Sequence, residues 1–311
     1  MRCVGDAAPY KILPPVGADI IRQSEFTMRT IEFKITEKDS GRQIRDFLRD
    51  FGVSSSLLTK LKNTENGITL NNAFARTIDP IKAGDILKIN IENRGQMPAP
   101  SDKRVEIIFE DEDIIAVNKP PFMPVHESRN HQGDALSNAV ANYVDKNTAF
   151  RAVYRLDRDT SGIVLIAKNE LVASKLAGQI KKDYYAVASR DIGEKGTIKA
   201  PIARENESII KRCVKDGGET AVTHFEKIKA FKHGVLYKIN LETGRTHQIR
   251  VHFAHLGASL VGDTLYGGNS KLINRQALHC KTIYFTHPIT GEEMKLNSDF
   301  PEDIKILLEK Q

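Results

Sequence analysis

The chain has 311 residues, of which 40% are hydrophobic and 28% are charged, enough apolar material for a large core beneath a well-solvated surface. The length predicts roughly two domains. Lys and Arg total 46 against 40 for Asp and Glu, and the resulting net charge of +6 favours an anionic partner. A basic protein that merely stays soluble has the same balance, so charge alone leaves both interpretations open.

The cysteine spacing and the absence of long apolar runs limit the cellular compartments in which the protein is expected. Cys3, Cys213 and Cys280 are widely spaced and form no CxxC pair, which favours a reducing compartment and argues against a zinc knuckle. No apolar run approaches the ~20 residues of a membrane span. Pro14 and Asp19 interrupt any secretory signal core. We therefore expect a cytoplasmic protein without a membrane partner.

Residues 1–30 mix proline, glycine and charge without a period, so we interpret them as a loose extension. Regular patterning begins at residue 31, and residues 31–92 predict a compact module of two helices backed by a small sheet. Serines at 54–56 offer an N-cap for the second helix. The expected elements are a strand at 31–35, helices at 41–51 and 57–62, and strands at 67–70 and 87–91.

Five basic side chains lie outside the apolar faces of these two helices: Arg42, Arg45, Arg49, Lys60 and Lys62. They suit RNA phosphates, but ordinary solvated helix faces explain them equally well. The element order, with its Gly67-to-Asn71 strand and Gly84-Asp85 turn, resembles the small RNA-binding domain named after the ribosomal S-four protein. That resemblance implies that the five basic residues contact RNA.

Residues 93–103 are rich in glycine, proline and polar side chains, which is typical of a linker that lets the module move independently. Residues 104–311 combine many strands with a few helices and predict an α+β domain with a mostly antiparallel sheet. Strands are expected at 105–110, 114–120, 163–167, 182–187, 222–226, 236–240, 277–286 and 293–296, and helices at 134–143 with Asp134 as cap, at 171–180, at 244–257 and after Pro301.

The loop from Tyr154 to Gly162 holds two arginines and two aspartates between apolar runs. Loops held by buried strands often carry catalytic groups, and Asp157 is the leading carboxylate. A nucleophilic role requires it to be ionised, positioned by a cation and partly shielded from water. Taken alone, the loop is explained slightly better by aspartates that bond their own turn amides.

Other chemistries fit less well. A paired-carboxylate hydrolase would recruit Asp159, but a neighbour two residues away on a turn more naturally holds the loop. His247, His252, His255 and His279 include an i, i+3 pair but no HExxH arrangement, so polar core or RNA-facing histidines explain them better than a metal site does. No nucleotide-binding glycine loop or GxSxG elbow is present.

Five motifs, in chain order over residues 105–310, resemble those of the RluA/RluD-type pseudouridine synthases. They are Asn118-Lys119-Pro120 with His126, Arg155-Leu156-Asp157 with Thr160-Ser161-Gly162, Lys182-x-Tyr184-x-Ala186, Thr243 to His252, and Gly262-Asp263-x-x-Tyr266-Gly267. The resemblance implies a mostly antiparallel mixed-sheet catalytic domain behind a small α/β RNA-binding domain. It also implies a uridine isomerase that uses no cofactor and no metal, and it favours ribosomal over transfer RNA as the substrate. Nothing in the sequence demands more than a monomer, so we expect one.

The resemblance assigns three catalytic roles. Asp157 is the nucleophile for cutting the bond from uracil N1 to the ribose, after which the base turns and rejoins through carbon 5. Arg245 pairs with Asp157 and keeps it ionised. Tyr184 lies on the uracil face and removes the carbon 5 proton, while strand alternation sends Tyr185 to the opposite face. The alternative, a non-catalytic RNA-binding assembly factor, predicts the loss of Asp157 or Tyr184, and both are present.

Four further residues are expected to contact RNA. By the resemblance, Arg155 enters the space that a flipped-out uridine vacates. The structural alternative is a surface ion pair between Arg155 and Asp159. His247, Gln248 and Arg250 start a helix, where they suit a phosphate or the ribose, although they equally suit a scaffold.

Two positions depart from the family pattern. Tyr154 stands where many relatives have histidine, and it fills the same volume and still donates a hydrogen bond. The glycine usual in the first proline-rich motif appears as Phe122 or Met123, which is expected to reshape that loop.

Overall fold

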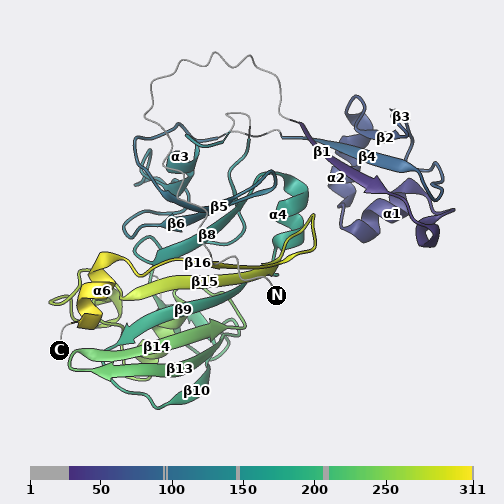
Figure 1. The fold of residues 1–311 in the computed structure, drawn as a ribbon. Helices are drawn as coiled ribbons and strands as arrows, with labels where there is room; N and C mark the ends of the chain where they lie inside the picture. Colours follow the sequence, from purple (N-terminus) through teal and green to yellow (C-terminus); the bar gives the residue numbers. More distant parts are fainter. Residues whose placement is uncertain (1–27, 94, 96, 145–147, 206–209, 310–311) are drawn as a thin grey trace.

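The computed structural model describes residues 28–93, 95, 97–144, 148–205 and 210–309. Most of the expected N-terminal extension, with Cys3, therefore lies outside the described residues. The described part is an α+β structure in which a small four-stranded sheet and a large ten-stranded sheet each have their own core (Figure 1). None of the described helices is long and apolar enough to cross a membrane.

The small module has the strand order β1-β4-β2-β3, with all neighbours antiparallel. Its second helix begins as predicted, because the Ser54 hydroxyl accepts a hydrogen bond from the Leu57 amide at 3.1 Å. Its first strand begins at Met28, which pairs with Glu92, so residues 28–30 belong to the sheet. The elements are β1 (Met28–Lys34), η1 (Glu37–Asp39), α1 (Ile44–Phe51), α2 (Ser55–Asn63), β2 (Ile68–Leu70), β3 (Ala73–Phe74) and β4 (Ile86–Glu92).

The large sheet runs β10-β13-β14-β9-β15-β8-β6-β5, with β16 beside β15 and β7 beside β8. Among the described strands only β8 and β15 pair in parallel, which confirms the mostly antiparallel mixed sheet. The strands are β5 (Glu106–Glu110), β6 (Ile114–Lys119), β7 (Arg151–Ala152), β8 (Ser161–Ala167), β9 (Lys181–Ala188), β10 (Lys195–Lys199), β13 (Val222–Phe231), β14 (Gly234–Leu241), β15 (Leu278–Thr286) and β16 (Glu293–Asn297).

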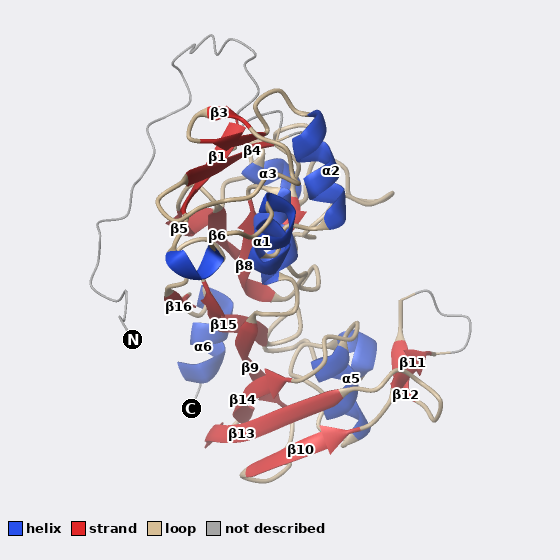
Figure 2. Ribbon diagram, turned by 90° about the vertical axis from the view of Figure 1, so that its right-hand side faces the viewer, coloured by secondary structure: helices blue, strands red, loops and turns tan. Residues whose placement is uncertain are grey.

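Short helices cover this sheet, and Figure 2 shows α5 beside the β13 and β14 strands. A separate hairpin pairs β11 with β12. The remaining elements are α3 (Leu136–Val140), α4 (Glu170–Leu176), β11 (Ile202–Arg204), β12 (Arg212–Val214), α5 (Gln248–His255), η2 (Thr264–Tyr266) and α6 (Glu302–Glu309).

Strand β8 anchors the loop that precedes it. All seven of its residues are buried, as its continuous apolar run predicts for a central strand. At Gly162 the backbone has φ 119°, and a Cβ atom there would lie 2.2 Å from the carbonyl oxygen of Cys280. Only glycine permits this approach of β8 to β15. The 154–160 loop is thereby fixed to the middle of the sheet.

Two helix predictions need correction. The cap of α3 is Ala135 and not Asp134, because the Asp134 carboxylate is engaged by His131 at 2.9 Å. Helix α5 starts at Gln248 rather than 244, because His247 adopts a left-handed conformation with φ 58° and the residues before it form a turn. Both differences come from side-chain and backbone contacts that apolar spacing does not report.

The small module also packs directly against the large domain. Leu171 of α4 is buried within the hydrophobic cluster of the module. Lys175 of α4 donates to the carbonyl oxygen of Phe51 at 2.8 Å and lies over its ring. Lys60 pairs with Glu170 at 2.5 Å. These contacts oppose the independent movement that the composition of residues 93–103 predicts.

We expect Leu171→Ala to lower the free energy of unfolding by about 2–5 kcal/mol, because it leaves a cavity between α4 and the module. Chemical denaturation measures this loss, and limited proteolysis should cleave residues 93–103 faster. Leu256→Ala is the matched control, since Leu256 is exposed. Equal denaturation midpoints and equal cleavage rates for the two variants would contradict the docking.

Candidate active site

A cleft of about 820 Å³ opens where the 154–160 loop, strand β9 and the turn before α5 meet. Residues that are far apart in the sequence meet at its walls. The cleft brings together all the residues of the large domain predicted to form the site: Arg155, Asp157, Tyr184, Arg245, His247, Gln248 and Arg250.

Asp157 lies in this cleft with one carboxylate oxygen anchored. Its Oδ2 accepts a hydrogen bond from Arg250 Nη1 at 3.2 Å and lies 3.9 Å from His247 Nε2. No hydrogen-bond or ion-pair partner within the described part of the chain contacts Oδ1. The side chain is 27% exposed, so the carboxylate is positioned and partly shielded while one oxygen stays free to react.

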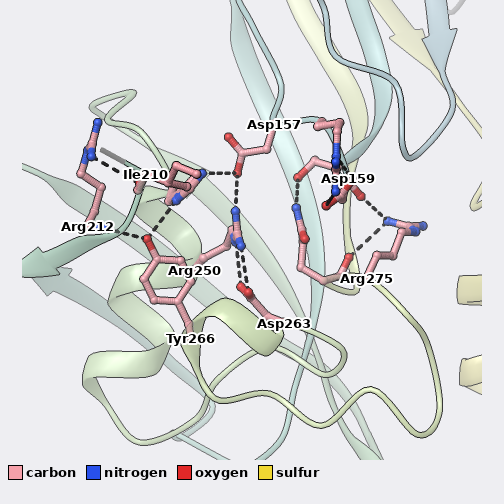
Figure 3. Close-up of polar contacts among 12 residues, drawn as sticks. Asp157, Asp159, Ile210, Arg212, Arg250, Asp263, Tyr266 and Arg275 are labelled. Atoms are coloured by element: carbon pink, nitrogen blue, oxygen red, sulfur yellow. Dashed lines mark hydrogen bonds and ion pairs between the residues drawn. The ribbon is translucent and has the colours of Figure 1, made fainter. Parts of the chain in front are cut away.

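Arg250 is a buried cation shared by two carboxylates, with Tyr266 beside it (Figure 3). Its Nε and Nη2 donate to Asp263 at 2.7 and 2.8 Å, and its Nη1 donates to Asp157. Burial opposes the charge, but hydrogen bonding to Asp263 and the charges of both carboxylates raise the pKa of Arg250 above its usual value. The guanidinium is therefore a fixed positive charge beside Asp157.

The pairing predicted for Arg245 is wrong in this structure. Arg245 Nη1 contacts Glu219 at 2.6 Å, and its Nε donates to the carbonyl oxygen of Thr220. The reason is the left-handed turn at His247, which places Arg245 in the turn before α5 and Arg250 in the first turn of the helix. Arg250, predicted to bind RNA, is the cation that holds Asp157.

Gln248 also differs from its predicted binding role. Its Oε1 accepts from the Arg245 amide and the Thr243 hydroxyl, and its Nε2 donates to the carbonyl oxygen of Val222 and the hydroxyl of Thr223. The side chain is buried and its amide is fully occupied. Gln248 therefore holds the turn before α5 to strand β13 and leaves no group for RNA.

Tyr184 projects from β9 into the cleft wall and is 6% exposed. Burial raises the pKa of its phenol well above the usual value, and the negative charge of Asp157 acts in the same direction. The phenol is therefore protonated at neutral pH. Its neighbour Tyr185 packs against Phe300 in a different cluster, as the alternation of the strand predicts.

Lys119 clamps the proline-rich loop to the catalytic loop. Its ammonium donates to the carbonyl oxygens of Pro120, Met123 and Arg158 at 2.8–2.9 Å, and burial lowers its pKa to about 7. Phe122 sits inside this loop with φ 62°, a conformation that favours glycine. Phe122 is therefore the position in this loop at which glycine would be free of backbone strain.

Two further residues, Arg275 and Tyr154, form hydrogen bonds that hold the 154–160 loop and the start of β8 in place. Arg275 is buried and donates to the carbonyl oxygen of Asp159 at 3.0 Å while pairing with Asp303. The Tyr154 hydroxyl donates to the carbonyl oxygen of Ile163 at 2.8 Å. Tyr154 thus supplies a hydrogen bond in place of the usual histidine. Sequence reasoning missed Arg275, because it lies alone in a loop without any motif.

Some charged side chains of the 154–160 loop form ion pairs, and others have no ion-pair partner among the described residues. Asp159 pairs with Arg158 at 2.7 Å, which agrees with a turn-holding role. Arg155 is exposed at the cleft, and no hydrogen bond or ion pair engages it within the described residues. The alternative of an Arg155–Asp159 ion pair is therefore not formed.

The five basic residues of the module also differ among themselves. Arg42 pairs with acidic side chains of its own helix region, Arg45 with Asp46, and Lys60 with Glu170. Arg49 and Lys62 are exposed and have no ion pair among the described residues. These two side chains are the ones free to meet a phosphate.

One acidic and histidine group, Asp111, Asp113 and His287, has the spacing of metal ligands. Arg29 donates to both carboxylate oxygens of Asp113. His287 Nδ1 lies 3.1 Å from the Thr290 amide, which leaves the proton on Nε2, 3.0 Å from Asp111. Because Arg29 occupies Asp113 and the Nε2 proton of His287 faces Asp111, this group does not present free metal ligands.

The chain belongs to the RNA pseudouridine synthase family. The profile of the family described as RNA pseudouridylate synthase matches residues 113–255. The chain is 36% identical over 277 residues to the uncharacterized RNA pseudouridine synthase YjbO of Bacillus subtilis, covering 85% of this chain and 98% of that relative. It is 37% identical to the ribosomal large subunit pseudouridine synthase D of Pseudomonas aeruginosa, covering 78% and 82%.

A solved structure agrees on the fold. Human RNA Pseudouridylate Synthase Domain Containing 1 superimposes with a TM-score of 0.53 at 23% identity, covering 66% of this chain and 87% of that one. The fold class predicted from the sequence is therefore confirmed, and the protein is an isomerase of this family.

We expect Arg250→Gln to reduce pseudouridine formation by on the order of 10²-fold or more, because Asp157 loses its cation. It should also cost about 3–5 kcal/mol of stability, since Asp263 is left buried and unpaired. Arg245→Gln, which breaks a surface pair, should change stability by less than about 1 kcal/mol and keep most activity. A larger activity loss for Arg245→Gln than for Arg250→Gln would refute the assignment.

Proposed function

We propose that this protein isomerises uridine to pseudouridine in structured large-subunit ribosomal RNA, with Asp157 as the nucleophile. The observation that carries the proposal is the Asp157 carboxylate, anchored through Oδ2 by the buried Arg250, while no described residue binds Oδ1. The ribosomal substrate is supported by relatives named ribosomal large subunit pseudouridine synthase D at 35–37% identity. No observed contact favours the non-catalytic alternative.

The reaction moves one bond and balances internally. Asp157 Oδ1 attacks the ribose carbon that carries the base, and the bond from that carbon to uracil N1 breaks. The base turns, and carbon 5 then bonds to the same ribose carbon as the bond to Asp157 Oδ1 breaks, which restores the carboxylate. One proton leaves carbon 5 and one arrives on N1, so no co-reactant is consumed. Tyr184 is the group placed to receive the carbon 5 proton. Because burial keeps its phenol protonated, Tyr184 passes its own proton to N1 or to solvent as it does so.

Arg155 supports access to a base within a stacked stem. Flipping the uridine costs a few kcal/mol, and a cationic side chain that fills the vacated space offsets this cost. Arg155 is exposed at the cleft two residues before Asp157, and no described partner has to be broken when it moves.

The small module is the second RNA contact in this proposal, as an S-four-type domain whose Arg49 and Lys62 neutralise phosphates. The overall charge of +6 is consistent with this partner. A monomer in the cytoplasm, where ribosomal RNA is modified, completes the proposed setting.

We expect Asp157→Asn to abolish tritium release from RNA labelled at carbon 5 of uridine, because an amide is not a nucleophile. Tyr184→Phe should reduce release by on the order of 10²-fold or more through loss of the proton acceptor. Ser128→Ala, at the rim of the cleft, is the control. Unchanged release by Asp157→Asn, or free uracil as the product of the wild-type protein, would sink the proposal.

We expect the double variant Arg49→Ala/Lys62→Ala to bind RNA more weakly and to reduce the slope of log affinity against log salt by about 1.5, because two phosphate contacts disappear. Filter binding over a salt series measures the slope. The control of equal charge is Lys195→Ala/Lys232→Ala, at β10 and the β13–β14 turn. Identical slopes for the two double variants would argue against the module as an RNA contact.

A further inference from the structure

His247 lies at the start of α5 in an unusual backbone conformation. Its φ of 58° is left-handed, which for a residue other than glycine costs on the order of 1–3 kcal/mol. Its imidazole is largely buried in the wall of the cleft, with Nε2 3.9 Å from Asp157 Oδ2. Such a conformation persists only where other contacts hold the residue in place.

Tyr266 holds that ring from the other side. Its hydroxyl lies 2.9 Å from His247 Nδ1, and the two rings meet edge to face with centroids 5.7 Å apart. The same hydroxyl accepts a hydrogen bond from the backbone amide of Arg212 at 3.0 Å. Figure 3 shows Tyr266 between Arg212 and Arg250.

The direction of the hydrogen bonds follows from this arrangement. Burial raises the pKa of Tyr266, so its hydroxyl keeps its proton. The Arg212 amide occupies a lone pair of the oxygen, and the hydroxyl proton is then available for His247 Nδ1. If Nδ1 accepts, the ring proton of a neutral His247 must lie on Nε2, on the side of Asp157.

We propose that Tyr266 is a positioning residue that fixes His247 as the Nε2–H tautomer, and that this N–H closes onto Asp157 Oδ2 when RNA binds. The distance of 3.9 Å is about 1 Å longer than a hydrogen bond, so a small closure completes it. Asp157 Oδ2 then receives two donors, Arg250 and His247. The carboxylate can no longer rotate, and Oδ1 faces the substrate as the reacting oxygen. The inference rests on the proposed role of Asp157.

The charges around His247 suit a neutral ring. Asp157 and Asp263 favour its protonation, whereas Arg250 and Arg212 oppose it. Burial is the largest influence, and the pKa of His247 is lowered from its usual value of 6.5. The ring is therefore neutral at neutral pH, as a fixed tautomer requires. A donor on Nδ1 also stabilises the neutral form, so removing the Tyr266 hydroxyl should raise this pKa.

The first test reads the tautomer directly and needs no RNA. Long-range ¹H–¹⁵N spectra of the full-length protein at neutral pH are expected to show His247 protonated at Nε2, with its signals assigned by their loss in His247→Gln. Tyr266→Phe is expected to give a mixture of tautomers and a higher titration midpoint. Protonation at Nδ1 in the wild-type protein would overturn the proposal even if Asp157 proves to be the nucleophile.

The second test follows the reaction over pH. Protonation of His247 puts a second positive charge beside Asp157 and weakens the carboxylate as a nucleophile, so the rate is expected to fall as the pH drops below the His247 pKa. Tyr266→Phe is expected to lower kcat by about tenfold, the worth of one neutral hydrogen bond, and to shift this acid limb of the profile to higher pH. His247→Gln keeps an N–H donor without a titrating ring, so it should retain more activity than His247→Ala and lack that limb. Tyr284→Phe, which removes a tyrosine hydroxyl bonded to Asp183 outside the cleft, is the control.

The outcomes separate the two proposals. An inactive wild-type protein would remove the proposed function while the tautomer test still stands. An active enzyme whose Tyr266→Phe variant keeps its rate and its acid limb would overturn the positioning role alone. Unfolding of Tyr266→Phe would be visible in the same spectra, and His247→Gln then carries the test.

Discussion

A buried guanidinium shared by two carboxylates is the interaction on which the candidate active site depends. Arg250 binds Asp263 with two hydrogen bonds and has one left for Asp157. Taking these charges out of water is expensive, and only a pairing with good geometry offsets the cost. Asp263 is needed so that Arg250 cannot turn away, and Arg250 is needed so that Asp157 remains an anchored carboxylate in the cleft that Tyr184 also lines.

The supports of the site are strained or tightly constrained where they meet the catalytic loop. His247 and Phe122 adopt left-handed conformations, and Gly162 allows two strands to approach more closely than a side chain would permit. Such conformations persist only where surrounding contacts determine them. Here Tyr266 holds His247, and Lys119 holds the loop that contains Phe122. The strained residues therefore lie in the two segments that contact the 154–160 loop, next to the side chains that hold them.

The docked module places a second basic surface at a fixed position relative to the cleft. Leu171 joins the two hydrophobic cores, and the Lys60–Glu170 pair lies at the same junction. Under the proposed function, an RNA that spans both units would meet Arg49 and Arg155 at positions that the docking contacts already fix. This preorganisation lowers the entropic cost of binding.

The sequence alone predicted a two-part organisation, most elements, and Asp157 and Tyr184 as candidate catalytic residues, because apolar periodicity, caps and motifs are local signals. Both residues line the cleft. The Ser54 cap and the buried β8 strand follow from adjacent residues. The cationic partner of Asp157 could not be predicted in this way. Arg245 and Arg250 belong to the same motif, and their positions in the sequence do not show which of them reaches Asp157. Only the tertiary structure decided between them, because a left-handed turn at His247 and a distant Asp263 direct Arg250 to the carboxylate.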